Sequence, residues 1–142
     1  MEVVQQLENI SNTDDICDIL DTMLEDNVNI TFSIIFKLLQ KFNKNVIFHV
    51  QCMALLKYII TCESFDVPII NENENVKIIN MSLNLVNKNR SKMNNEQITQ
   101  YIEDCIIVLY KLNTDIHELK ILERMYNDYS NDLSHVKCFI QN

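Results

Sequence analysis

Residues 30–62 read ITFSIIFKLLQKFNKNVIFHVQCMALLKYIITC, and this stretch decides the fold. Apolar side chains recur every three or four residues on both sides of Asn43-Lys44-Asn45, which is the spacing of α-helices. So short a connection sends the second helix back along the first. The stretch therefore predicts an antiparallel helical hairpin, with one helix over residues 30–42 and another over residues 46–62.

The first helix of this hairpin is apolar on nearly every side, and only Ser33, Lys37, Gln40 and Lys41 are left for water. A helix of this kind is either central in a fold or covers a docking groove. We expect the central position, and the groove stays open as the alternative.

On either side of the hairpin the helical spacing continues. Residues 1–28 predict acidic N-terminal helices, the second of them starting at a Thr13 cap. Residues 63–73 hold the only proline, Pro68, and predict a loop. Residues 74–142 return to helices, one of them opened by a capping box of Asn94 and Gln97. We expect residues 1–142 to form one all-α domain of six to eight helices in antiparallel hairpins, arranged as a short stack or a compact bundle.

The chain contains no glycine. Dinucleotide fingerprints, phosphate-binding loops and the nucleophile elbow of α/β-hydrolases need backbone conformations or close approaches that glycine supplies, so these enzyme families are excluded. The lack of glycine and the single alanine, beside many asparagines and isoleucines, indicate an AT-rich genome, such as that of a parasite or a large DNA virus.

The segment VQCMALLKYI, residues 50–59, resembles the inner helix of armadillo and HEAT repeats, with the small Ala54 inside a buried helix. Residues 50–61 also align with residues 102–114, so that Tyr58 meets Tyr110. The resemblance covers about residues 30–113 and implies the shape of a helical repeat. No functional residues follow from it.

Charge is divided unevenly along the chain. The net charge is -8, and the first 30 residues carry eight acids and no Lys or Arg. Their spacing puts four carboxylates on one face of a helix, where they repel one another by a few tenths of a kcal/mol per pair. Three lysines form a basic stripe on the next helix. We expect the two stripes to form an interaction surface, facing each other within the chain or an external partner; the residues are Asp14, Asp18, Asp21, Glu25, Lys37, Lys41 and Lys44.

Catalytic and metal-binding patterns are incomplete. His135 and Cys138 have a spacing that supplies half of a zinc site, and its other two ligands would have to come from elsewhere in the chain, such as Cys105 or His117. The number of cysteines, five, is odd, and no CxxC pair occurs, which favours reduced thiols packed in a core. We therefore expect no metal, no cofactor and no catalytic residue.

These observations predict a non-enzymatic protein-interaction module or a small subunit of a larger cytoplasmic assembly, with protein partners and no membrane span. A sequence pI near 4.7 argues against nonspecific binding to nucleic acid. One alternative is a viral Bcl-2-like adaptor, although the glycine-containing groove motif of that family is absent. A second alternative is a small enzyme that uses Cys and His.

Overall fold

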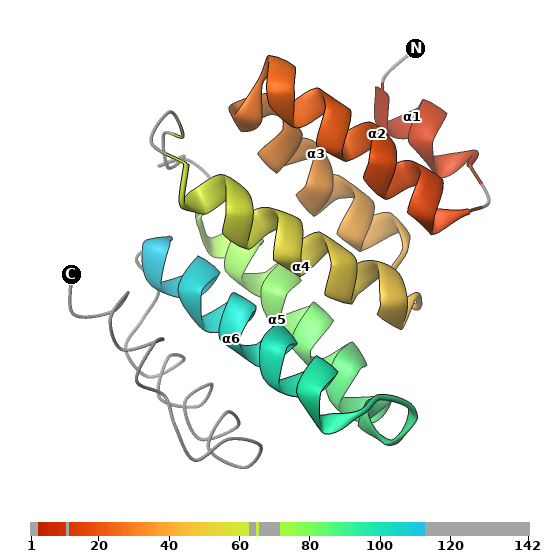
Figure 1. Ribbon diagram of the computed structural model, residues 1–142, viewed down its shortest axis with the longest axis vertical. Coiled ribbons are helices and arrows are strands. Elements are labelled where there is room, and N and C mark those ends of the chain that lie inside the picture. The colour runs from red at the N-terminus through yellow and green to blue at the C-terminus, as the bar shows by residue number, and fades with distance from the viewer. Residues whose placement is uncertain (1–2, 11, 63–64, 66–71, 113–142) are drawn as a thin grey trace.

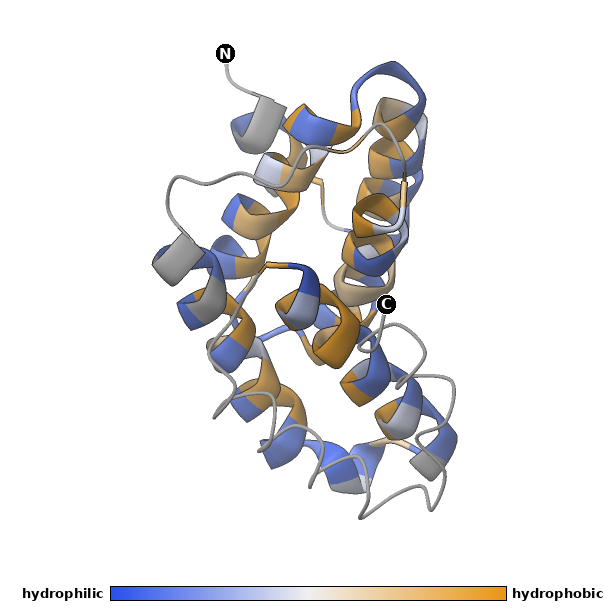
Figure 2. Ribbon diagram, turned by 90° about the vertical axis from the view of Figure 1, so that its left-hand side faces the viewer, coloured by the Kyte–Doolittle hydropathy of each residue, from blue (hydrophilic) through white to orange (hydrophobic). Residues whose placement is uncertain are grey.

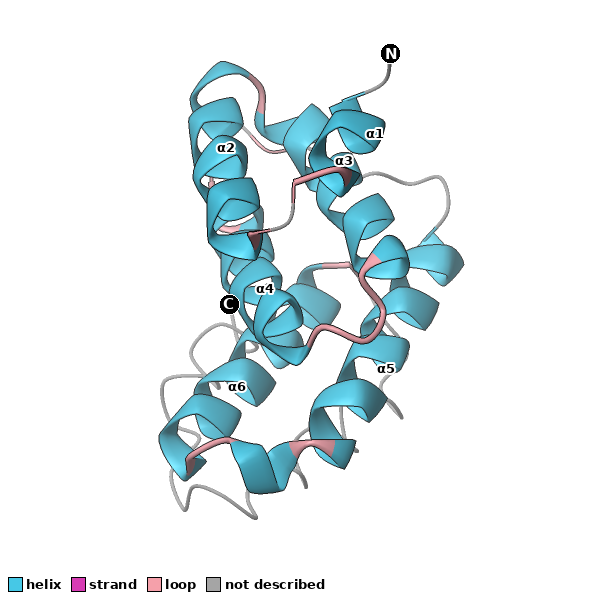
Figure 3. Cartoon of the chain, turned by 90° about the vertical axis from the view of Figure 1, so that its right-hand side faces the viewer, coloured by secondary structure: helices cyan, strands magenta, loops and turns pink. Residues whose placement is uncertain are grey.

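The computed structural model describes residues 3–10, 12–62, 65 and 72–112, and these residues form helices, turns and loops without a strand (Figure 3). The helices are α1 (Val3–Glu8), α2 (Thr13–Asp26), α3 (Val28–Lys41), α4 (Val46–Ile60), α5 (Glu72–Lys88), the 3-10 turn η1 (Arg90–Lys92) and α6 (Asn95–Lys111). The predicted all-α class is confirmed. The expected helices beyond residue 112 lie outside the described residues.

The helices lie in two layers, one made of α2, α4 and α6 and the other of α1, α3 and α5 (Figure 1). From α2 onward each helix contacts the helix that follows it in the sequence and also the next helix of its own layer. Consecutive helices run antiparallel, so α2, α4 and α6 all point the same way. Figure 2 shows apolar residues where the helices face one another and hydrophilic residues on the turns.

The hairpin at the centre of the chain forms as predicted, with helices over Val28–Lys41 and Val46–Ile60. Helix α3 is central, since Ile35, Leu38 and Leu39 have no exposed surface and Phe32 has almost none. Each of these side chains stabilises the fold by about 1.5–3 kcal/mol through burial of its apolar surface. The four polar positions that the sequence left for water, Ser33, Lys37, Gln40 and Lys41, are exposed.

Asparagine is the N-cap residue of four helices in this glycine-free chain, α2, α3, α4 and α6. The side-chain oxygen of each capping asparagine accepts a backbone N–H from the first turn, which satisfies a donor that has no partner inside the helix. At α6 the capping box of Asn94 and Gln97 is present, as predicted. At α2 the predicted Thr13 cap is wrong, because Asn12 occupies that position and Thr13 is already helical. The bonds are Asn12 to Asp14 (2.9 Å), Asn27 to Ile30 (3.0 Å), Asn45 to Phe48 (3.0 Å) and Asn94 to Gln97 (2.8 Å).

No described helix combines the length and the apolar character that a membrane crossing requires.

The cap of α4 provides a test of this local architecture. Replacing Asn45 by Ala removes the acceptor of the Phe48 N–H, and we expect the free energy of unfolding to fall by about 0.5–2 kcal/mol in urea denaturation. Asn43 is the matched control, because it lies exposed in the same turn and caps no helix. Equal losses for Asn43→Ala and Asn45→Ala would contradict the assignment of the cap.

Candidate functional site

The four predicted acids lie exposed along α2. Their stripe runs beside α4, the neighbouring helix of the same layer. At one end, the Asp14 carboxylate accepts a hydrogen bond of 2.8 Å from the Gln51 Nε2 of α4. Further along, Asp21 lines a groove between the two helices. The stripe therefore borders α4.

The basic stripe lies elsewhere. Lys37 and Lys41 belong to α3, in the other layer, and Lys44 belongs to the turn between α3 and α4. All three side chains are exposed, and within the described part of the chain no ion pair of 4 Å or less joins them to the acids of α2. The tertiary structure thus leaves both charged stripes accessible to other molecules.

The groove between α2 and α4 has a volume of about 440 Å³. Ala54 and Leu55 of α4 give it an apolar floor, and the short side chain of Ala54 leaves open space that a larger one would fill. Tyr58 stands at its side with 60 % of its surface exposed, the second largest exposure among the large hydrophobic residues described. The lining residues are Cys17, Asp21, Gln51, Ala54, Leu55 and Tyr58.

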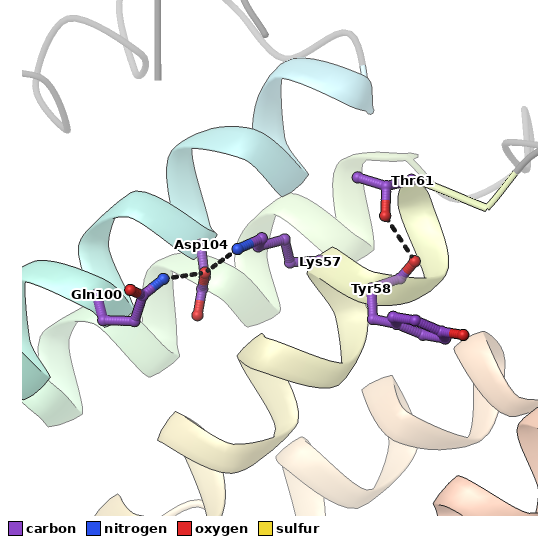
Figure 4. Close-up of polar contacts among 5 residues, drawn as sticks. All are labelled: Lys57, Tyr58, Thr61, Gln100 and Asp104. Carbon is purple, nitrogen blue, oxygen red and sulfur yellow. Dashed lines mark hydrogen bonds and ion pairs between the residues drawn. The ribbon is translucent and has the colours of Figure 1, made fainter. Parts of the chain in front are cut away.

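An ion pair fixes the opposite side of α4. The Lys57 Nζ lies 3.5 Å from the Asp104 Oδ1 of α6, and the Gln100 Nε2 donates to the same oxygen at 3.0 Å. Figure 4 shows Lys57 pointing to α6 while the neighbouring Tyr58 points away from it. Burial raises the pKa of Asp104, against the opposing effect of Gln100 and Lys57. The Asp104 carboxylate therefore has polar partners within the fold, and Lys57 reaches it from the side of α4 that Tyr58 does not occupy.

Cys17 is the one thiol in the groove. Its Sγ donates to the Gln51 Oε1 at 3.5 Å. A hydrogen bond with the Cys52 thiol lowers the pKa of Cys17, while burial and the nearby acids of α2 oppose that shift. Burial raises the pKa of Cys52 well above its ordinary value. All four cysteines in the described ranges are free thiols, as expected for those positions, and Cys138 lies outside those ranges.

A buried polar chain joins α4, α5 and α6. The His49 Nε2 lies 2.9 Å from the carbonyl oxygen of Phe42, so this nitrogen carries the proton and donates. The His49 Nδ1 then accepts from the Ser82 Oγ at 2.8 Å, and that oxygen accepts from the Tyr101 hydroxyl at 2.6 Å. A serine bonded to a histidine is also the pattern of hydrolases. Here both side chains have no exposed surface, so a substrate does not reach them and the chain of bonds serves packing.

The predicted zinc half-site of His135 and Cys138 lies outside the described residues, as does His117. Among the residues that the structure describes, no group of three or more His, Cys, Asp or Glu side chains is arranged to hold a metal ion.

Two features of the groove were missed by the sequence reasoning. Ala54 was expected inside a buried helix, and that expectation is wrong because Ala54 is exposed on the groove floor. Tyr58 was noted only for its alignment with Tyr110. A possible signal was the position of Ala54 and Tyr58 one helical turn apart, which places them on the same face of α4.

Comparison with known proteins returned no match: no family model, no curated protein and no solved structure matches this chain.

The buried imidazole predicts a pH dependence of stability. Burial lowers the pKa of His49 in the folded protein, and the hydrogen bond to Phe42 only partly opposes this. Below the ordinary histidine pKa of about 6.5 the unfolded chain binds a proton that the folded chain does not. We therefore expect the free energy of unfolding to be highest above that pH and to fall as the pH decreases toward 5.

His49→Gln is the variant that checks this, since glutamine retains a donor for the Phe42 carbonyl and does not titrate. Urea denaturation at pH 7.5, 6.5 and 5.5 should show a stability gap between wild type and variant that narrows with acidification. Taking the difference cancels titrations that the two proteins share, including those of the other two histidines. A gap that is constant with pH would rule out a buried neutral imidazole at position 49.

Proposed function

We propose that this chain is a non-enzymatic protein-interaction module that holds a basic, amphipathic segment of a partner protein in the groove between α2 and α4. The observation that carries the proposal is the combination of an apolar floor with an acidic rim, which consists of Asp21 in the groove lining and the other three acids of its stripe on α2. No ion pair joins these acids to a cation within the described part of the chain. A module of this kind fits a subunit of a larger assembly in a reducing, cytoplasmic compartment.

The apolar part of the groove supplies the anchor. Exposed aromatic residues that close over an apolar partner contribute strongly to protein interfaces, and Tyr58 is placed for this role. Beside it, Ala54 and Leu55 leave room for one or two apolar side chains of the partner.

The acidic rim supplies charge complementarity. Asp14, Asp18, Asp21 and Glu25 repel one another along α2, and a row of Lys or Arg side chains on the partner would relieve that repulsion. Because the carboxylates are exposed, their contribution is greatest to the rate of association and decreases with salt.

The arrangement of helices supports this proposal. In armadillo and HEAT repeats, stacked helix pairs form extended surfaces on which other proteins bind. The two layers of this chain and the parallel direction of α2, α4 and α6 are consistent with the resemblance of residues 30–113 to those repeats.

A peptide titration tests the proposal. The probe is a fluorescein-labelled, 18-residue amphipathic peptide of Lys and Leu, and its binding is followed by fluorescence anisotropy at 50 and 300 mM salt. We expect binding that weakens with salt, and a loss of affinity of roughly tenfold for Tyr58→Ala and for Asp18→Lys with Asp21→Lys.

The matched control is Asp15→Lys with Asp26→Lys. These acids are exposed on the same helix, and the change in net charge is identical. At about 100° per residue, however, they lie on a different face from Asp21. Similar losses in the two double variants would show that only net charge matters and would contradict the groove as the binding site.

A further inference from the structure

A second concave surface lies at the edge of the molecule, between two successive turns. The turn from α3 to α4 and the turn from α5 through η1 to α6 lie at the same end of the helix layers (Figure 1). Together they line a cleft of about 680 Å³, which we call the edge cleft. It is larger than the groove between α2 and α4 and lies within the size range of ligand pockets.

The edge cleft is basic and partly apolar. Lys41, Lys44 and Lys92 line it, and none of the described residues in its lining is acidic. Phe42, Ile47 and Met93 contribute apolar surface. Ile47 is 67 % exposed, the largest exposure of any large hydrophobic side chain described. In a protein of net charge -8, a site lined by lysines without acids is a local exception.

The first turn of α4 adds donors to the same cleft. Val46 and Ile47 line it, and their backbone N–H groups make no hydrogen bond to the protein within the described ranges. Amides at the start of a helix, together with the helix dipole, favour a negative charge. They thus act in the same direction as the three lysines.

Both walls of the edge cleft are held by internal bonds. On one side the Phe42 carbonyl accepts from the His49 Nε2 at 2.9 Å and from the Asn45 N–H at 3.1 Å. On the other side the Asn89 carbonyl accepts from the Lys92 N–H at 3.0 Å, and the Asn89 side chain donates to the Leu85 carbonyl at 2.8 Å. A cleft with fixed walls loses little conformational entropy when a ligand binds.

We propose that the edge cleft binds an acidic segment of a partner protein, with an apolar side chain of that segment packed on Ile47 and its carboxylates facing Lys44 and Lys92. The lysines of the cleft favour an acidic occupant. The exposed Ile47 favours an occupant that also carries an apolar side chain next to its acidic ones. A nucleic acid is disfavoured because an extended row of phosphates needs more cations than the three lysines that line the cleft.

This site is independent of the groove between α2 and α4. The two surfaces share no lining residue and have opposite charge. A partner that carries both a basic and an acidic segment would contact both of them, but either proposal stands without the other.

The test uses the full chain and a fluorescein-labelled, 12-residue peptide of Glu and Leu, with fluorescence anisotropy as the measurement. A peptide with Gln in place of every Glu is the uncharged comparison, and a single-stranded oligonucleotide of 12 residues is the second. We expect the acidic peptide to bind at least tenfold more tightly than either comparison. Equal or tighter binding of the oligonucleotide would overturn the proposal in favour of a nucleic-acid site.

Substitutions of cleft residues test whether the peptide binds at the edge cleft. Lys44→Glu with Lys92→Glu should weaken binding of the acidic peptide at least tenfold, and Ile47→Ala should weaken it severalfold. The matched control is Lys77→Glu with Lys111→Glu, which makes the same change in charge at exposed lysines outside the cleft lining, and it should change the affinity less than twofold. Equal losses in both pairs would overturn the proposal.

Three further measurements separate loss of binding from misfolding and from self-association. Lys92→Gln adds no acid and should still weaken binding of the acidic peptide severalfold, so it shows that the loss in the double variant is not due to misfolding. Circular dichroism checks the helical content of each protein.

Sedimentation velocity of the unmodified chain tests whether the occupant is a second copy of this chain. Self-association that is lost both in Lys44→Glu with Lys92→Glu and in Asp18→Lys with Asp21→Lys would identify such a copy. That result would overturn the proposal of a different partner protein.

Discussion

Helix α4 is the constraint on which the other helices depend, because it is the helix that contacts α2, α3, α5 and α6. Its six central apolar residues have little or no exposed surface, and they pack in several directions at once: Phe48, Cys52, Met53, Leu56, Ile59 and Ile60. Two polar contacts add to this packing. His49 is bonded to α5 through Ser82, and Lys57 is paired with Asp104 of α6. With α4 in this orientation, Ala54 and Tyr58 lie on the side that borders the groove with α2.

The same packing separates the charges of the chain. Because the layers alternate, α2 lies beside α4, and the turn after α3 lies beside the turn after α5. The acids of α2 therefore border an apolar groove, while Lys44 and Lys92, far apart in the sequence, line one cleft. The low overall pI conceals this local division, since the acidic and basic surfaces are summed in a single number.

Asparagine has a structural use in this chain that composition alone did not reveal. Its abundance was attributed to the genome, yet Asn12, Asn27, Asn45 and Asn94 each cap a helix. Without glycine, the turns rely on side chains that satisfy backbone donors locally, and asparagine is among the best residues for that purpose. An AT-rich genome as the source of the many asparagines and their use as helix caps are compatible, because asparagine is a favourable residue at the start of any helix.

The sequence by itself determined the helical class, the central hairpin, the buried position of α3 and the capping box at Asn94, because helical periodicity and capping are properties of neighbouring residues. It also located the acids of α2 on one face. Only the tertiary structure decided which residues of other helices lie next to these acids. An apolar helix such as α4 offers several equivalent sides, so periodicity did not indicate that Ala54 and Tyr58 would be exposed. The edge cleft depends on residues from two turns that are separated by more than 40 positions, and their meeting follows from how the layers pack.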